Sequence, residues 1–505
     1  MLAIFFVSAA VAPAHASLRT PLPLSHVKLG YNAALKNDQA DYDTRYFSQR
    51  LDHFKSDNVS AMQWPQRYLF NDKHWGGPGF PILFYTGNEG PIEAFYGACG
   101  FMTDVLAPKL RGLLVFAEER FYGESLPFGK GNASFTPAAL AYLSTEQVLA
   151  DYVTLLTSLK AELKASTSKV VAFGGSYGGT LSTIFRAKYP HVVVGALAAS
   201  APLGYYAPSQ WGERGVDEFT WFGPVQRDYA QARPGCYKAL VRAVGLANAS
   251  AHSSEPAKKK ALATSFGLCD PPAQPEAFIY WITEALESMP QIDYQYPVGA
   301  LPASPVNATC ATVREELGDA ALLAALGGIV QTFYGVSAVG GGESGCVPEA
   351  SARSQQVLGG TPGDGPMPHD SWGYQSCTET LHAFSVPQGS WRTFSFSLAA
   401  ETAQCQQYYN ATPRTHWLEE WSGGYDISAP DSGHSNIIWS NGKRDPWHGG
   451  GFLRPTDALP GGAVFVMEET AHHQDLRAPH PADPPELTRV RAQEEKIIRG
   501  WLAAE

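Results

Sequence analysis

In the N-terminal part of the chain, short apolar runs alternate with segments in which apolar residues recur at helical spacing. Each run has the length and composition of a buried strand. One intervening segment, 145–159, predicts a helix with Ser144 or Thr145 as its N-cap. Strand, helix and strand in this order predict a doubly wound, mostly parallel sheet, with a site built by the loops at the carboxyl ends of its strands. The apolar runs are 81–86, 113–117, 170–173 and 192–198.

Beyond these runs the pattern becomes helical and rich in glycine, proline and cysteine. Helical stretches cover 276–289 and 320–336, and Gly/Pro-rich loops cover 340–367. Apolar runs typical of parallel strands return at 435–440 and 463–467. We therefore interpret the middle of the chain as a helical insertion that forms a lid over the site, and an unrelated appended domain is the alternative.

The first residues predict a secretory signal peptide. An apolar run at 2–11 ends in the small-x-small pattern 14–16, which suits cleavage before Ser17, although no basic residue precedes the run. A frayed start is the other reading. No other segment is long and apolar enough to span a bilayer, so we predict no membrane span. The predicted division is a signal peptide at 1–16, an N-terminal arm or propeptide at 17–45, a first sheet part at 46–205, a helical cap at 206–425 and a second sheet part at 426–505.

The composition is that of a globular protein with a large core. Of 505 residues, 44% are hydrophobic and 17% are charged. The formal net charge is −11, and the one short basic run, 258–260, is typical of a solvated helix face. Nucleic acid is therefore not an expected partner.

The seven cysteines lie mostly in the second half of the chain, and no pair has the close spacing of a zinc site. We expect disulfides and no metal. Because seven is an odd number, one thiol is left over, and the isolated Cys99 is the expected free one. The chain also has no Gly-rich phosphate loop, so no cofactor is expected. The other cysteines are Cys236, Cys269, Cys310, Cys346, Cys377 and Cys405.

Sequons of the type Asn-x-Ser/Thr occur along the whole chain. One sequon is expected by chance, but five fit a glycosylated protein of the secretory pathway. Their asparagines are Asn58, Asn132, Asn248, Asn307 and Asn410.

The pattern Gly-x-Ser-x-Gly, centred on Ser176, directly follows the apolar run 170–173 and precedes a helical segment at 181–188. A tight strand-to-helix turn needs small residues, because the serine backbone is strained and its neighbours pack closely. The context predicts that this turn presents the Ser176 hydroxyl at the carboxyl edge of the sheet as a nucleophile.

The two late strands predict the partners of this serine. Asp445 follows the first of them and His472 follows the second, which gives the chain order serine, acid, histidine. An imidazole would take the seryl proton, and a carboxylate would fix its tautomer. The plainer readings are a turn aspartate before proline and a polar loop histidine. Asp475 is the second candidate for the acid, but it lies close in sequence to His472.

An oxyanion hole would use backbone amides beside the nucleophile. We predict the amide of Tyr177 and one from the loop 87–90, with Gly87 as the first choice. The run 448–451 spells a lipase oxyanion motif, but it follows the acid instead of an early strand, and we interpret it as a turn.

Six motifs, in the same order along 46–477, resemble the serine peptidase family of lysosomal Pro-X carboxypeptidase, dipeptidyl peptidase II and thymus-specific serine protease. The motifs lie at 47–54, 85–90, 120–125, 174–179, 441–447 and 471–477.

The resemblance implies an α/β-hydrolase fold with a helical cap and exopeptidase cleavage after proline, in a lysosome or vacuole or outside the cell. It also implies that His472 and not His473 is catalytic. The segment 372–379 resembles a cap motif of the same family, which implies that Cys377 pairs with Cys405.

The chain departs from the family pattern at two places. Many relatives have Glu-His where this chain has Glu118-Glu119, and many have methionine where it has Thr180. Threonine beside the nucleophile would make the first specificity pocket smaller and more polar, so a strict preference for proline is in doubt.

The expected substrate-binding residues are Asn88, Glu89, Trp447 and Thr180. Trp447 would give an apolar wall for a proline ring. Glu89, if ionised, would attract a free peptide amine and favour release of N-terminal dipeptides, whereas a protonated Glu89 would weaken that argument. Cleavage at the amino or the carboxyl end therefore stays open.

Two other classes of function fit the same fold. An esterase or lipase would use the same three residues, and a non-catalytic adhesion module would not need them. Peptide substrates are the expected partners, and a homodimer is an assembly that the sequence leaves open.

Overall fold

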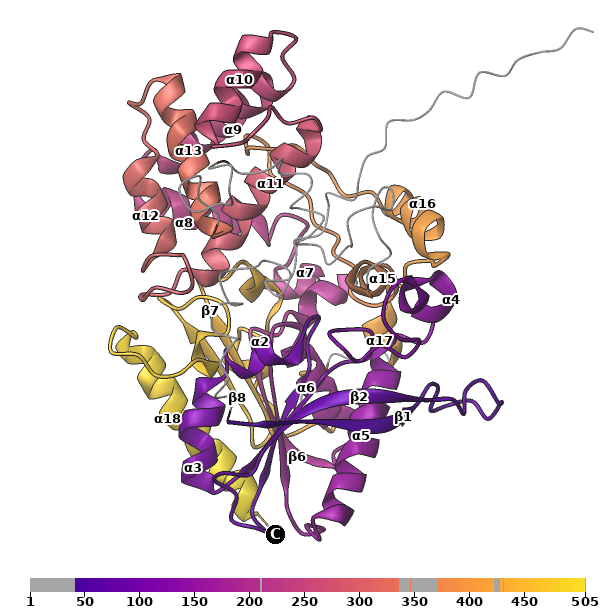
Figure 1. Cartoon of the computed structure of the whole chain (residues 1–505). Helices are drawn as coiled ribbons and strands as arrows, with labels where there is room; N and C mark the ends of the chain where they lie inside the picture. The colour runs from indigo at the N-terminus through magenta and orange to yellow at the C-terminus, as the bar shows by residue number, and fades with distance from the viewer. Residues whose placement is uncertain are drawn as a thin grey trace, which may run out of the picture.

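The computed structural model describes residues 41–208, 211–335, 346, 371–421, 427–429 and 431–504 (Figure 1). The predicted signal peptide and nearly all of the predicted arm lie outside the described residues, as do most of the Gly/Pro-rich loops at 340–367.

The core of the molecule is an eight-stranded sheet with the order β1-β2-β4-β3-β5-β6-β7-β8. β1 and β2 form an antiparallel pair, β2 is antiparallel to β4, and all later pairings are parallel. The four early apolar runs form β3 to β6, and the two late runs form β7 and β8. The strands are β1 Asp43–Arg50, β2 Gln63–Asn71, β3 Ile82–Thr86, β4 Leu113–Ala117, β5 Val170–Gly175, β6 Val193–Ala199, β7 Ile437–Gly442 and β8 Ala463–Met467.

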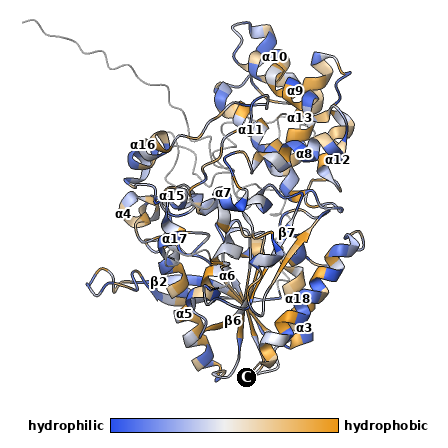
Figure 2. Ribbon diagram, turned by 180° about the vertical axis from the view of Figure 1, so that it is seen from behind, coloured by the Kyte–Doolittle hydropathy of each residue, from blue (hydrophilic) through white to orange (hydrophobic). Residues whose placement is uncertain are grey.

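Both faces of the sheet are buried, which explains why the central strands are apolar without interruption. Phe84 and Val115 pack on the side of α5 (Thr145–Glu162) and α6 (Tyr177–Lys188), whereas Leu83 and Leu114 pack on the opposite side, with α3 (Ala107–Leu110) and α18 (Pro485–Ala503). Figure 2 shows hydrophobic residues along β7 and both hydrophobic and hydrophilic residues along α18. The predicted helix at 145–159 is α5, and the Ser144 side chain caps it by accepting a hydrogen bond from the Gln147 amide.

A group of helices covers the sheet at the edge where the parallel strands end (Figure 1). It has a hydrophobic core of its own, to which Trp447 and Ala471 from the loops after β7 and β8 also contribute. The predicted boundary between 205 and 206 falls inside the short 3₁₀ helix Leu203–Tyr206, and the division into domains stays a prediction. The longer helices of this layer are α8 Phe222–Ala232, α9 Cys236–Ala251, α10 Pro256–Ser265, α11 Pro275–Ser288, α12 Pro305–Thr312, α13 Asp319–Phe333, α15 Ser371–Thr378 and α16 Leu398–Tyr409. The last two, α15 and α16, pack their buried residues into the core on the α5 and α6 face of the sheet.

Three disulfides crosslink this layer, two of them between helices, and the remaining cysteine, Cys99, is a buried free thiol. Disulfides are typical of proteins that fold in an oxidising compartment. In the described part of the chain, no helix combines the length and the apolar character that crossing a membrane requires. The disulfides are Cys236–Cys310, Cys269–Cys346 and Cys377–Cys405.

Candidate active site

Ser176 lies in a strained turn between β5 and α6. Its φ of 58° and ψ of −128° place a non-glycine residue in a conformation that L-amino acids rarely adopt. The turn also requires glycine on both sides: a Cβ on Gly174 would lie 2.0 Å from the Gly178 carbonyl oxygen, and one on Gly178 would lie 2.2 Å from Asn88 Oδ1. The helix begins at Tyr177, four residues earlier than the sequence predicted, so the serine stands directly at its N-terminus.

Asp445 and His472 are brought together from the ends of β7 and β8. His472 Nδ1 lies 2.6 Å from Asp445 Oδ2, and both side chains are buried. The other carboxylate oxygen of Asp445 accepts a hydrogen bond from the Trp447 amide at 2.9 Å. A carboxylate bonded in this way fixes the imidazole tautomer that leaves Nε2 free to accept a proton.

The second candidate for the acid lies elsewhere. The Asp475 carboxylate accepts a hydrogen bond from the Ser440 hydroxyl, on β7, and among the described residues no hydrogen bond joins it to either histidine ring. Asp445 is therefore the carboxylate that meets His472 in the described structure.

His473 points to the nucleophile turn from a different position. Its backbone has a φ of 36°, its amide donates to the Ser200 hydroxyl at 2.8 Å, and its ring would be 3.0 Å from a Cβ on Gly175. Burial, with the neighbouring His472 and Arg477, lowers the pKa of His473 well below its usual value. The neutral ring therefore packs against the turn that carries Ser176.

The loop after β3 approaches the same turn. The Asn88 side chain donates from Nδ2 to the Gly175 carbonyl at 2.7 Å and accepts from the Tyr85 hydroxyl at 2.9 Å. Both of its polar atoms are thus engaged inside the protein, so Asn88 supports the turn in this structure. A Cβ on Gly87 would lie 2.4 Å from the Ala117 carbonyl oxygen, which explains the glycine there.

Glu89 and Glu119 are two buried carboxyl groups beside the site. Burial raises the pKa of Glu89 to about 7, and a weaker interaction with His472 opposes the increase. Burial also raises the pKa of Glu119 well above its usual value, while hydrogen bonds from Tyr177 and Gln375 act in the opposite direction. Both groups are therefore protonated in a mildly acidic medium.

Two segments of the helical layer contact the site, and sequence reasoning had missed both contacts. The backbone oxygen of Gln291 accepts a hydrogen bond from the His472 amide at 2.9 Å, and its side-chain oxygen accepts one from the indole N–H of Trp447 at 3.0 Å. From α15, Gln375 donates to the Tyr177 hydroxyl at 2.7 Å and to Glu119 at 3.2 Å. Gln375 lies in the cap motif 372–379, which offered a signal, whereas nothing near Gln291 did.

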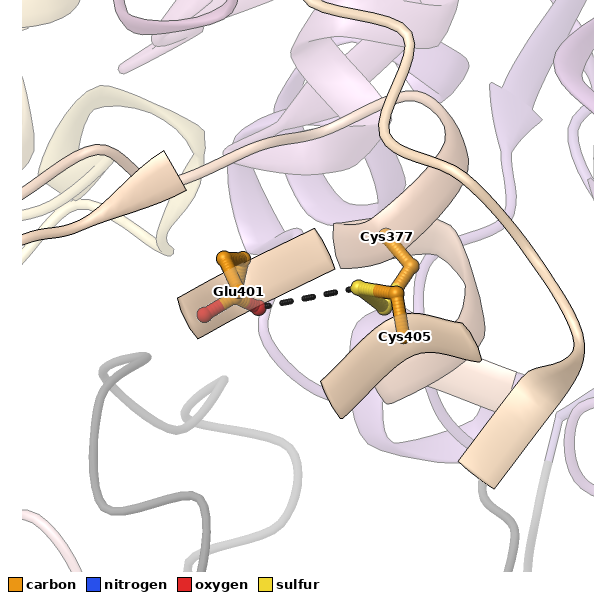
Figure 3. A group of neighbouring side chains, drawn as sticks. All are labelled: Cys377, Glu401 and Cys405. Atoms are coloured by element: carbon orange, nitrogen blue, oxygen red, sulfur yellow. Dashed lines mark hydrogen bonds between the residues drawn. A yellow bond between two sulfur atoms is a disulfide. The ribbon is translucent and has the colours of Figure 1, made fainter. Parts of the chain in front are cut away.

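A group of metal-capable side chains, Cys377, Glu401 and Cys405, is shown in Figure 3. Its two sulfur atoms are bonded to each other, so neither is available as a thiolate ligand. Glu401 Oε1 lies 3.8 Å from Cys405 Sγ, which is a contact and not a hydrogen bond, because a disulfide sulfur carries no proton. In the described residues this group is therefore a structural disulfide.

The mostly parallel sheet and the strained serine between β5 and α6 define an α/β-hydrolase. The chain belongs to the family described as serine carboxypeptidase S28, whose model matches residues 49–494. The protein is thus a serine-type peptidase, and the resemblance seen in the sequence motifs is confirmed.

Known proteins similar to this chain include the lysosomal Pro-X carboxypeptidase of Homo sapiens, which is 35% identical over 92% of this chain and 88% of its own length. The prolyl carboxy peptidase like protein 5 of Caenorhabditis elegans is 36% identical over 91% of this chain and 90% of its own. The thymus-specific serine protease of Mus musculus is 27% identical over 90% and 87%.

Among solved structures, the proline iminopeptidase of Mycobacterium smegmatis matches with a TM-score of 0.35 and 13% identity, over 91% of this chain and 100% of that chain. This score is low, and the fold assignment rests on the strand order and the family.

Proposed function

We propose that this protein is a serine exopeptidase that hydrolyses short peptides after proline, with Ser176, His472 and Asp445 as its catalytic residues. The observation that carries the proposal is the buried hydrogen bond between His472 and Asp445, at the same sheet edge as the strained Ser176 turn. An esterase or an adhesion module on this fold is less well supported, because the family is one of peptidases.

In the proposed reaction, Ser176 Oγ attacks the carbonyl carbon of the scissile bond while His472 Nε2 takes the hydroxyl proton. Asp445 holds the Nδ1–H and stabilises the imidazolium. His472 then gives the proton to the leaving amine as the C–N bond breaks, and a water molecule hydrolyses the resulting acyl-enzyme by the same route. The amide of Tyr177 and an amide of the loop at Gly87 would donate to the oxyanion.

We infer cleavage at the carboxyl end of the peptide. A carboxyl group with a pKa of about 7, as burial gives Glu89, carries a proton in an acidic compartment. It then neither attracts a free amine strongly nor repels a free carboxylate, so the electrostatic argument for removal of N-terminal dipeptides loses its basis. The similarity to Pro-X carboxypeptidases favours release of the residue that follows proline.

Trp447 and Thr180 remain the residues proposed to border the substrate. Trp447 is held at two points: its backbone amide donates to Asp445, and its indole N–H donates to Gln291. A fixed aromatic wall next to the catalytic acid would hold a proline ring at little cost in entropy. Asn88, with both polar atoms engaged, is proposed to position the serine turn and not to bind substrate.

We propose that the protein acts in the lysosome or vacuole, or outside the cell. Three disulfides fit passage through the secretory pathway. All five sequon asparagines, Asn58, Asn132, Asn248, Asn307 and Asn410, are exposed, as glycan attachment requires. A homodimer stays a prediction.

The nucleophile assignment is tested with Ser176→Ala. We expect a folded protein whose kcat/KM on an X-Pro-X peptide falls by about 10⁴-fold or more, because the remaining groups supply only residual catalysis. Mass spectrometry of the wild-type products from a longer X-Pro-X-X peptide shows whether an X-Pro dipeptide leaves from the amino end, and an X-X-Pro-X peptide shows whether the last residue leaves from the carboxyl end. A panel of acyl esters measured in parallel tests the esterase alternative. A fluorophosphonate probe that labels the variant as strongly as the wild type would rule out Ser176.

A further inference from the structure

His382 is a buried histidine in the segment that follows α15. Its exposed fraction is 5%, and neither ring nitrogen has a hydrogen-bond partner among the described residues. Burial lowers the pKa of His382 to about 3, so the ring is neutral in any physiological medium. A neutral imidazole offers one donor and one acceptor, and leaving both unsatisfied in the interior is unfavourable.

The surroundings of His382 are aromatic. Its ring centroid lies 5.5 Å from that of Tyr206, 5.7 Å from that of Trp372, and 5.4 Å from those of Phe384 and Trp447. Four such rings bury the imidazole without satisfying its nitrogens. A core position of this kind would be better filled by leucine or methionine if packing were its only role.

Three of these aromatic neighbours lead directly to the active site. Trp447 donates its amide to the catalytic acid at 2.9 Å. The Trp372 ring lies 5.4 Å from the ring of Tyr177, the residue after the nucleophile. Burial raises the pKa of Tyr206, and Glu89 lies close enough for its carboxylate charge to add to that increase. In space, a single aromatic side chain thus lies between His382 and each of three parts of the site: Asp445, the Ser176 turn and the loop after β3.

A second unsatisfied polar group belongs to the same site. Thr180 lies on the first turn of α6, and its amide donates to the Ser176 carbonyl at 3.0 Å. Its hydroxyl is buried and has no hydrogen-bond partner among the described residues. Buried polar groups without partners beside a reaction centre are the groups that a substrate can satisfy.

We propose that His382 is a specificity-determining residue, and that it hydrogen-bonds a hydroxyl or carboxamide group on the substrate residue at the acyl side of the scissile bond. The inference rests on the proposed function, which places that residue against Trp447, the ring that His382 also contacts. Hydroxyl and carboxamide groups both donate and accept, as a neutral imidazole requires of its partner. A charged side chain does not fit, because the aromatic rings would strip its water without giving it a counter-ion.

The preferred substrates are therefore hydroxyl-bearing or carboxamide-bearing analogues of the apolar residue, such as 4-hydroxyproline in place of proline or threonine in place of valine. A site that is built to hydrogen-bond a substrate group rejects the isostere that lacks it far more strongly than an apolar pocket rejects an extra methylene. We expect the wild-type protein to cleave each polar member of these pairs with a kcat/KM at least about tenfold higher.

The test compares the wild-type protein with His382→Leu and His382→Gln on peptides whose acyl-side residue is proline, 4-hydroxyproline, valine, threonine, leucine or asparagine. His382→Leu should bring the ratio within each pair close to one, through slower cleavage after the polar member. His382→Gln keeps a donor and an acceptor and should retain part of the preference. The exposed His191 gives a matched control, because His191→Leu should leave every ratio unchanged.

Thermal unfolding separates this role from a structural one. If the imidazole serves binding, His382→Leu removes an unsatisfied buried group, and its Tm should equal or exceed that of the wild type. A lower Tm with unchanged substrate ratios would overturn the proposal and make His382 a packing residue.

The panel also distinguishes the proposal from the proposed function. Cleavage after proline and 4-hydroxyproline at equal rates in all three proteins would overturn the role of His382 and leave the prolyl peptidase intact. Cleavage after threonine or asparagine that depends on His382, without cleavage after either imino acid, would support the role of His382 and overturn the preference for proline. A wild-type protein that cleaves no member of the panel would overturn both.

Discussion

At the scale of single residues, the adjacent histidines His472 and His473 differ in what their rings contact, although they are neighbours in one turn. His472 turns Nδ1 to Asp445, and its backbone is held on both sides, by the Gln291 carbonyl and by the Tyr294 hydroxyl at 3.0 Å. His473, one residue later, has a positive φ and packs its ring on Gly175. Since His472 is the one of the two that contacts Asp445 in the described structure, it is the imidazole that the proposed mechanism uses as the base.

This difference predicts different losses for the two alanine variants. His472→Ala should reduce kcat by about 10⁴-fold or more without unfolding the protein, because the base is lost. His473→Ala should leave most of the kcat and lower the free energy of unfolding by about 1–3 kcal/mol, because a packed ring is removed. Steady-state kinetics and denaturant unfolding measure both effects. An inactive but stable His473→Ala protein would show that His473, and not His472, is the base.

At the scale of elements, α15 links the helical layer to the nucleophile turn. Its Trp372 packs on Tyr177, and its Gln375 bonds to Tyr177 and Glu119. The disulfide Cys377–Cys405 ties this short helix to α16. A helix of eight residues is not stable alone, so its position depends on such external constraints.

The Cys377→Ala/Cys405→Ala variant should therefore lose both stability and activity. Loss of a crosslink that spans 28 residues costs about 3–4 kcal/mol in the chain-entropy treatment. Activity should fall as well, because α15 no longer holds Gln375 against Tyr177. The control is Cys269→Ala/Cys346→Ala, which removes a crosslink spanning 77 residues. It should cost at least as much stability in thermal unfolding but leave the kcat of the folded protein nearly unchanged. Equal kcat values in the two variants would contradict the link through α15.

At the scale of the whole molecule, several carboxyl groups are buried without a cation strong enough to keep their pKa values low. Burial is the main cause for each of them, and they occur both in the loops of the sheet and in the helical layer. Such groups hold their protons in the folded protein at pH values where the unfolded chain has released them. Their pKa values are about 7 for Glu89, Asp228 and Glu284 and about 8 for Glu379.

Between pH 6.5 and 8 the folded protein should therefore lose stability as the pH rises. In this window the folded state binds more protons than the unfolded state, so the free energy of unfolding decreases with pH. The slope is up to about 1.4 kcal/mol per pH unit for Glu379 and smaller for the three groups with a pKa of about 7, which lose most of their protons before pH 8. Histidines with lowered pKa values act in the opposite direction, mainly below pH 6.5, where the unfolded chain binds protons that the folded protein does not. Tm measured against pH should fall, and Glu379→Gln should reduce the slope.

Glu379→Gln is a conservative change, because an amide oxygen in the place of Oε2 can still accept hydrogen bonds from the Thr145 amide and hydroxyl. The exposed Glu420 offers the control, since Glu420→Gln removes a carboxyl group that stays in solvent. Parallel Tm curves for Glu379→Gln and the wild type would show that Glu379 does not titrate in this range.

The sequence by itself determined the strands, the nucleophile turn and the order of the site. Apolar runs and the glycines around Ser176 act through contacts within a few residues, so the pattern alone located β3 to β8 and placed Ser176, Asp445 and His472 at strand ends. The tertiary structure decided which groups meet there. Gln291, Gln375 and His382 reach the site from the helical layer, through contacts whose partners lie far away in the sequence.

Contacts with residues that lie far away in the sequence also decide the roles of Asn88 and Glu89. Asn88 and Glu89 follow an early strand in the sequence, which suggested that both border the substrate. Only the packed structure determines that the side-chain amide of Asn88 is hydrogen-bonded to the Gly175 carbonyl and the Tyr85 hydroxyl. It also determines that burial raises the pKa of Glu89 to about 7. Local pattern fixes where a chain bends and which residues it buries, whereas desolvation and hydrogen-bond partners are properties of the assembled interior.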